Sequence, residues 1–335
     1  MRAPMPTPRG ALTEALTDGL RGHGVLRCAE PDSHDDAALA LWMLYELHHR
    51  GLEGVDDALE WDPALLVLRA RLEHDLEERW RDRARDLARP AQERLADGED
   101  FAEVFFDLCA ADTGGESLAR FVQREAATDQ VLALLRQRSI YHVREQDSAM
   151  WALPRLDDET KAHLVAIAAD EYGNGHPDHL HAELWRRGMS ACGLDTGYAA
   201  YVDEALSEVL DQNNLMSMLG LHRRLVPAAL GHLAAFEVCS SVPSRRMVRG
   251  LERLGMPEPI ADYYREHMVA DAVHEQVAVR RMLGGWVARE PHVAADVVWG
   301  VAVCRAAEQE TATAVLASVR GGTTHDRPQD REAVA

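Results

Sequence analysis

The sequence has few aromatic residues, few cysteines and no long apolar run. Only five of its 335 residues are Phe, whereas Ala, Leu, Arg and Glu are abundant, a composition that favours helices over β-strands. No run of about 18 apolar residues occurs, and no apolar stretch follows Arg2 and Arg9, so neither a membrane span nor a secretion signal is expected. The five cysteines are widely spaced without a CxxC pair, which disfavours a disulfide framework and a zinc knuckle. We therefore expect an all-α protein of the reducing cytoplasm.

Basic residues are in the minority. The chain has 36 Lys and Arg against 56 Asp and Glu, a formal net charge of −20. This balance opposes binding to a phosphate backbone or to an anionic membrane surface, so we expect neither nucleic acid nor a membrane as a partner. Cations bound inside the protein would lower the effective negative charge, and the composition is therefore compatible with a metal site.

The chain divides at a pair of glycines into two helical parts. Residues 1–9 and 321–335 lack an apolar stripe and are predicted to be disordered tails. Residues 10–113 form a predicted N-terminal helical segment, and residues 114–320 a second helical array whose stripes pack into a compact bundle. Breaks at Pro and Gly place the helices of this array at about 117–136, 138–150, 158–172, 178–192, 197–212, 214–240, 244–254, 257–284 and 292–319.

Glu46, His48 and His49 resemble metal ligands at first sight. They occur on a short amphipathic helical stretch with no matching cluster nearby in the sequence. We interpret them as structural residues on a solvated or capping edge.

The strongest ligand pattern is in the segment YYREHMVADAVHEQVA, residues 263–278. His267, Asp271 and His274 stand at positions i, i+4 and i+7, within roughly 60° of one another on a helix surface. Apolar residues surround this stripe, so it can point inward. The alternative is a surface stripe in which His and Asp form an ordinary ion pair.

Glu237 lies in an almost entirely small or apolar run, GHLAAFEVCSS. Burying an ionised carboxylate there is costly without a cation or several donors. Either a bound metal or an ion pair with Arg245 or Arg246, which are close in sequence, would satisfy it.

A third segment, DEYGNGHPDHLHAELW, contains Glu171 and His181 on either side of a bend rich in Gly and Pro. Such a bend can aim both side chains at one point. His176 and His179 compete as ligands, but they fall in or beside the turn, where exposed histidines are common.

These segments supply three carboxylates and three imidazoles without sulfur. This donor mixture suits iron or manganese better than a structural zinc, and carboxylates can bridge two metals. Helical bundles build dinuclear carboxylate sites from facing helices, although the usual Glu-x-x-His pairs are missing here.

At these residues the sequence resembles the heme-oxygenase-like diiron oxidases, also called iron-containing redox enzymes, over about residues 115–315. The resemblance implies a heme-oxygenase-like seven-helix bundle, here with an additional N-terminal helical segment. It also implies two irons that react as Fe(II) with O2 to form a peroxo-diferric oxidant, supported by an external reductant. The ligands it implies are Glu171, His181, Glu237, His267, Asp271 and His274.

Members of this family that oxidise nitrogen have an additional Glu, which matches Glu145 in YHVREQDSAMW. A fourth carboxylate would balance the charge of two Fe(II) ions, whereas the alternative is an exposed helical Glu. This match favours N-oxygenation of an amine or amino acid, through a hydroxylamine towards a nitroso or nitro product. Tyr141, Tyr263 and Tyr264 lie one turn before Glu145 or His267 and can line the pocket or support a ligand, or simply belong to the core.

Several alternatives remain at this point. The same cofactor serves oxidative decarboxylation, C–C fragmentation and desaturation of fatty or amino acids in other members of the family. A mononuclear or manganese–iron site, and a non-catalytic helical scaffold, also fit the pattern. Heme oxygenase itself is disfavoured by the carboxylate-rich set, and a thiaminase-like enzyme by the absence of Cys from these motifs. We expect a homodimer that acts on a small molecule.

Overall fold

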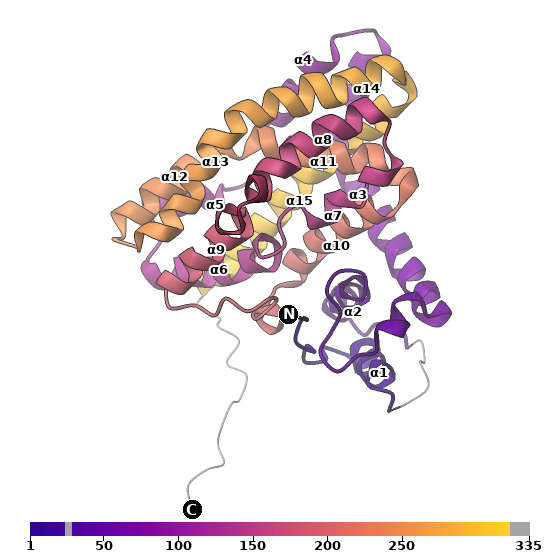
Figure 1. Cartoon of the computed structure of the whole chain (residues 1–335), viewed down its shortest axis with the longest axis vertical. Helices are drawn as coiled ribbons and strands as arrows, with labels where there is room; N and C mark the ends of the chain where they lie inside the picture. Colours follow the sequence, from indigo (N-terminus) through magenta and orange to yellow (C-terminus); the bar gives the residue numbers. More distant parts are fainter. Residues whose placement is uncertain (24–28, 322–335) are drawn as a thin grey trace, which may run out of the picture.

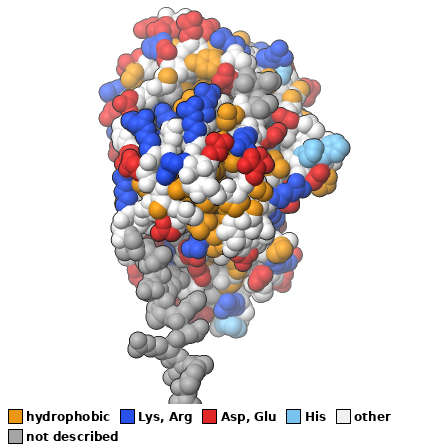
Figure 2. All heavy atoms as spheres, turned by 90° about the vertical axis from the view of Figure 1, so that its left-hand side faces the viewer, with side chains coloured by type: hydrophobic (Ala, Val, Ile, Leu, Met, Phe, Trp, Pro, Cys, Tyr) orange, Lys and Arg blue, Asp and Glu red, His pale blue; other side chains and the backbone are white. Residues whose placement is uncertain are grey.

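The computed structural model describes residues 1–23 and 29–321, and the side chains of 269–273 are excluded from the description. Within these residues all regular secondary structure is helical apart from a single isolated bridge between Ala3 and Leu52, so the predicted all-α class is confirmed. On the face drawn in Figure 2, acidic, basic and hydrophobic side chains are intermixed.

The N-terminal part begins with two helices that lie to one side of the bundle (Figure 1). These are α1, Ala11–Leu20, and α2, His34–Glu46, which pack on each other. The much longer α3, Pro63–Ala96, begins where Asp62 caps its first turn and Pro63 occupies the first helical position. It leads into the bundle, where it packs against the last helix and is followed by α4, Phe101–Ala110.

The prediction that residues 1–9 form a disordered tail is wrong. The backbone N–H of Ala3 donates to the carbonyl O of Gly51 at 3.0 Å, and the guanidinium of Arg2 pairs with Asp57 at 2.7 Å. Thr7 donates from its backbone and its hydroxyl to Asp203. The segment is ordered because its polar groups pair with distant residues that a local sequence pattern does not reveal. Residues 322–335 of the predicted C-terminal tail lie outside the described residues.

The remaining helices form the bundle that carries the candidate ligands, and α8, α11 and α13 run along it together (Figure 1). A π-helix, Val277–Leu283, continues α13 and packs against α8. π-Helical turns inside longer helices frequently occur at functional sites. The bounds are α5 Leu118–Arg124, α6 Thr128–His142, α7 Asp147–Met150, α8 Asp158–Glu171, α9 His181–Ala191, α10 Ser207–Leu221, α11 Val226–Cys239, α12 Ser241–Arg253, α13 Glu258–Gln276, α14 Gly284–Arg289 and α15 Ala294–Gly321.

Glycine lets α11 and α15 approach each other closely. A Cβ on Gly300 would lie 2.1 Å from the carbonyl O of Ala228, and a Cβ on Gly231 would lie 2.2 Å from that of Val297. Both distances are far shorter than any real contact, so only glycine fits at these two crossings. This close packing sets the position of α11, which carries Glu237.

Three predicted helices are interrupted, namely 138–150, 214–240 and 117–136, the last of which is divided between α5 and α6. A fourth, predicted over 197–212, begins only at Ser207. The prediction of one helix over 138–150 is wrong, because α6 ends at His142 and Gln146 adopts a left-handed conformation with φ 69°. The predicted helix 214–240 is divided between α10 and α11 because Pro227 starts a new helix. The first break places Glu145 in a turn and not on a helix.

No single helix in the described part of the chain is long and apolar enough to cross a membrane, although the bent pair Arg223–Cys239 and Ser241–Arg253 meets the criteria of length and composition together.

Candidate metal centre

Four helices and one turn bring the candidate ligands together in the bundle. Glu171 is the last residue of α8 and His181 the first residue of α9. Between them Gly173 adopts φ 70°, and a Cβ there would lie 2.7 Å from the backbone of His179, so the bend requires glycine. The bend returns the chain so that His181 faces Glu171, as the sequence predicted. Glu237 comes from α11, His267 and His274 from α13, and Glu145 from the turn after α6.

The first group of ligand atoms comes from Glu145, Glu171, His181 and His267, and these atoms all lie within 4.8 Å of one another. Nδ1 of His181 is 2.8 Å from Oε2 of Glu171, and Nε2 of His267 is 3.6 Å from Oε1 of Glu145. Glu145 and Glu171 are both buried. The interpretation of Glu145 as an exposed helical Glu is therefore wrong.

The second group comes from Glu171, Glu237 and His274, within the same limit of 4.8 Å. Nδ1 of His274 lies 3.2 Å from Oε2 of Glu237 and 3.6 Å from Oε1 of Glu171. Its other nitrogen, Nε2, lies 3.0 Å from Oδ2 of Asp170, a contact that the sequence reasoning missed. Glu171 thus belongs to both groups and lies between them.

The other described residues that the sequence offered as ligands or as ion-pair partners lie outside these two groups. Neither Arg245 nor Arg246 pairs with Glu237 in the described part of the chain, so the ion-pair alternative for this carboxylate is wrong. His176 and His179 are exposed in the bend, as expected. The side chain of Asp271 lies outside the described residues.

Three buried carboxylates at one place raise the pKa of the imidazoles of His267 and His274. Burial lowers the pKa of His267, but the hydrogen bond and charge of Glu145 outweigh burial and raise that pKa to about 10. Burial likewise opposes protonation of His274, whereas Glu237 and Glu171 raise its pKa to about 9. Burial raises the pKa of Glu237. The pKa of Glu145 is also raised by burial, but His142 and His267 outweigh this and hold it well below its usual range.

This arrangement fits a pair of metal ions. The ligand atoms are carboxylate oxygens and imidazole nitrogens without sulfur, a set suited to iron or manganese. The buried negative charge, which protonated histidines neutralise here, would equally be neutralised by cations. Glu171 is the residue that the two groups share.

A second layer of residues orients the ligands. The backbone carbonyl of Tyr263 accepts a hydrogen bond from Nδ1 of His267 at 2.8 Å, which leaves Nε2 facing Glu145. The hydroxyl of Tyr263 and Nδ1 of His142 both contact the Glu145 carboxylate. The sequence reasoning missed His142, although its position three residues before Glu145 was a usable signal.

A cavity of about 240 Å³ adjoins the cluster. Glu145, Glu171, Glu237 and His267 line one part of it, and the three tyrosines singled out from the sequence, Tyr141, Tyr263 and Tyr264, also line it. Another part is polar, with Arg138, Arg305, Glu308 and Gln212 among its lining residues. This is a site into which a small organic molecule with polar groups can fit beside the cluster.

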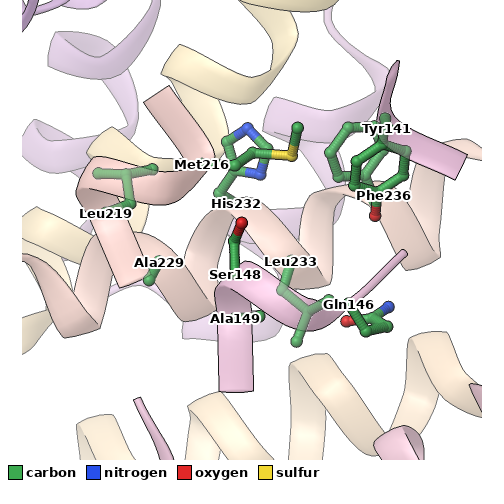
Figure 3. A pocket seen from close by; sticks show the side chains of 10 residues that line it. All are labelled: Tyr141, Gln146, Ser148, Ala149, Met216, Leu219, Ala229, His232, Leu233 and Phe236. Carbon is green, nitrogen blue, oxygen red and sulfur yellow. The ribbon is translucent and has the colours of Figure 1, made fainter. Parts of the chain in front are cut away.

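A second, much smaller cavity of about 30 Å³ lies near the same turn (Figure 3). His232 and Gln146 contribute polar side chains to it, and Tyr141 and Phe236 line both cavities. Burial lowers the pKa of His232 to about 3, so this imidazole is neutral. The sequence reasoning did not single out His232.

Glu46, at the end of α2, and His48 and His49, in the turn after it, make structural contacts, but the expected solvated edge is wrong. Glu46 is fully buried, and its carboxylate accepts a hydrogen bond from Arg144 at 2.6 Å and another from Tyr198. His48 contacts Glu60 and Arg69, and the ring of His49 packs on Trp151.

The sequence matches the family described as iron-containing redox enzymes over residues 132–309, which is more than half of the chain. The chain therefore belongs to the iron-containing redox enzyme family, within the heme-oxygenase-like superfamily, and is an oxidoreductase of this class. The family predicted from the ligand pattern is confirmed, and the matched range includes all seven candidate ligands. No curated protein matches the chain.

Proposed function

We propose that this chain is a non-heme diiron oxidase that N-oxygenates an amine or amino acid. The observation that carries the proposal is the position of Glu171, whose carboxylate belongs to two adjoining groups of ligand atoms. The two irons would be held by Glu145, Glu171, His181, Glu237, His267, Asp271 and His274. When bound, they would supply the redox chemistry that activates O2.

The overall reaction needs a source of electrons. Conversion of an amine to a hydroxylamine consumes one O2, two electrons and two protons, and it releases one water. The two electrons come from a reductant outside the substrate. One further two-electron oxidation of the hydroxylamine would give the nitroso product, and another would give the nitro product.

The protein's own residues have three tasks in this reaction. Tyr263 and His142 hold the Glu145 carboxylate, which is the additional acid that favours nitrogen oxidation. The buried position of Glu145, Glu171 and Glu237 limits access of water to the reacting end of the cavity. The rest of the cavity must bind and orient the substrate beside this cluster.

The polar part of the cavity supports a substrate that carries a carboxylate. Arg138 and Arg305 both line it, and the one acid there, apart from the clustered carboxylates, is Glu308 among the described residues. Nη2 of Arg138 is 3.6 Å from Oε2 of Glu308, and Gln212 donates to Glu308. Two guanidinium groups against one carboxylate leave a positive charge for a substrate carboxylate, while Glu308 can accept an ammonium group.

Anaerobic loading with Fe(II), followed by addition of O2 and a panel of amines, amino acids and fatty acids, tests this proposal. We expect two irons per chain, O2 uptake that increases with an amino acid, and a hydroxylamine product identified by mass spectrometry. Glu171→Gln should lose iron and O2 uptake together. His179→Gln, which changes an exposed histidine in the adjoining bend, is the matched control and should behave like the wild type.

The other functions predict different results. If the product is carbon dioxide or an alkene, the reaction is decarboxylation or desaturation and the proposal of N-oxygenation is wrong. If anomalous scattering at the iron and manganese absorption edges shows equal occupancy by the two metals, the site is a manganese–iron site and not a diiron site. A chain that binds less than one iron and consumes no O2 would be a non-catalytic helical protein.

A further inference from the structure

Three thiols from three different helices meet beside the larger cavity. Cys109 comes from α4, Cys239 is the last residue of α11, and Cys304 lies on α15. Cys239 and Cys304 line the cavity, whereas Cys109 is buried and is absent from its lining. All three are free thiols.

Cys109 and Cys239 are in direct contact. The Sγ atom of Cys239 lies 3.7 Å from the backbone carbonyl O of Cys109, and the two thiols form a hydrogen bond with each other. A disulfide needs two cysteines whose side chains already approach one another, because larger separations require the backbone to move. The hydrogen bond between the two thiols brings these side chains together, although the two residues are 130 positions apart in the sequence.

Arg305 holds the pair in place. Its Nη1 donates to Sγ of Cys239 at 3.7 Å, and its Nη2 donates to the carbonyl O of Ala111, two residues after Cys109, at 2.6 Å. One guanidinium thus ties the end of α11 to the end of α4. This polar partner distinguishes the pair from cysteines that merely fill an apolar core.

The pair lies close to the proposed metal centre along the chain and along the cavity. Cys239 follows Glu237 by two residues on the same helix, and both line the larger cavity. A thiol that lines this cavity is on the same internal surface as the ligands Glu145, Glu171 and His267.

We propose that Cys109 and Cys239 are a dithiol–disulfide pair that supplies two electrons to the metal centre after it has reacted with O2. This inference rests on the proposed function, which requires a two-electron reductant for each turnover. The two S–H bonds break, one S–S bond forms, two Fe(III) ions become two Fe(II) ions, and two protons are released. A small dithiol from solution then reduces the disulfide through Cys239, the member that faces the cavity.

Thiol counting and disulfide mapping test the pair directly. Reduced, desalted protein is loaded anaerobically with two Fe(II) per chain, exposed to O2, returned to anaerobic conditions, alkylated and analysed by peptide mass spectrometry. We expect loss of two of the five thiols and a Cys109–Cys239 disulfide. Metal-free protein and protein loaded with redox-inert Zn(II) should keep all their thiols under the same exposure.

Variants provide matched controls. Cys109→Ala and Cys239→Ser should each prevent thiol loss and, without added reductant, halve the hydroxylamine formed per chain from about two to one. Cys192→Ser, which removes a half-buried thiol at the end of α9, should behave like the wild type. Disulfide mapping of the wild-type protein needs no variant. It therefore shows whether Cys109 and Cys239 form a disulfide even if a substitution prevents folding.

The outcomes separate this inference from the proposed function. Iron-dependent O2 uptake with both thiols still free would overturn the dithiol pair and leave the oxidase proposal standing. A disulfide that involves Cys304 in place of Cys109 would also overturn the pairing. Failure to bind iron or to consume O2 would overturn both, whereas equal thiol loss in the Zn(II) form would show oxidation unconnected with the metals and overturn the inference alone.

Discussion

The hydroxyl of Tyr263 lies 3.1 and 3.0 Å from the two carboxylate oxygens of Glu145, and 2.8 Å from Nδ1 of His142. A phenol has one proton, so donation to Glu145 requires Nδ1 of His142 to carry hydrogen and donate to the hydroxyl. Burial raises the pKa of Tyr263 well above its ordinary range, which keeps this proton on the phenol. Glu145 lies in a turn, and these two side chains therefore fix a carboxylate that no helix positions.

Tyr263→Phe should weaken iron binding by about 10- to 100-fold while leaving the helical content unchanged, because the Glu145 carboxylate loses a donor that orients it. Competition with a calibrated chelator measures the affinity, and circular dichroism checks the fold. Tyr264→Phe is the matched control, since this residue lines the same cavity and no contact to Glu145 is found for it among the described residues. Equal affinities for the two variants would show that Tyr263 does not orient the ligand.

The metal-free protein should lose stability as the pH rises. The pKa values of His267 and His274 are raised from 6.5 to about 10 and about 9 by the clustered carboxylates. The two protonated histidines therefore contribute fully to the free energy of unfolding below about pH 6.5. This contribution is lost as the pH rises through about 9 and 10. Urea denaturation at several pH values measures the free energy of unfolding.

His267→Gln should reduce this pH dependence, because the replacement amide does not titrate. Addition of Fe(II) at about pH 7 should release protons from both histidines, which calorimetry in buffers of different ionisation enthalpy detects. A stability that is flat up to about pH 10 would contradict the assignment of these protons.

Arg144→Met should lower the free energy of unfolding by about 3–5 kcal/mol, because Glu46 would remain buried without its cation. Both side chains are almost completely inaccessible, and the pair joins α2 to the turn that carries Glu145. Urea denaturation measures the loss. The double variant Arg144→Met with Glu46→Leu should recover much of it, and a double variant as unstable as the single one would show that the buried charge is not the cause.

Gly300→Ala should lower the free energy of unfolding by about 1–3 kcal/mol and weaken iron binding, because the added methyl pushes α15 away from α11 and displaces Glu237. Thermal and urea denaturation measure the first effect and chelator competition the second. Gly285→Ala is the control, since a Cβ there meets only the flexible ends of Arg289 and Glu159. It should be neutral or slightly stabilising, as alanine favours helix over glycine.

Local patterns predicted much of the centre but not all of it. The i, i+7 spacing of His267 and His274 places both on α13, and the Gly-rich bend between Glu171 and His181 brings these two within 2.8 Å. The break at Gln146 escaped prediction because nothing in HVREQDS marks a left-handed residue. His142 escaped as well, since its role depends on Tyr263, which is 121 positions away in the sequence.

The sequence by itself determined the helical class, the family and the kinds of ligand atom, because these depend on composition, periodicity and the order of a few residues. Tertiary structure alone decided how the ligands divide into two groups around Glu171, and that Glu145 stands in a turn held by Tyr263 and His142. It also decided that Cys109 meets Cys239. The physical reason is that such contacts join residues far apart in the chain, and their distances are set by close helix crossings such as the one at Gly300.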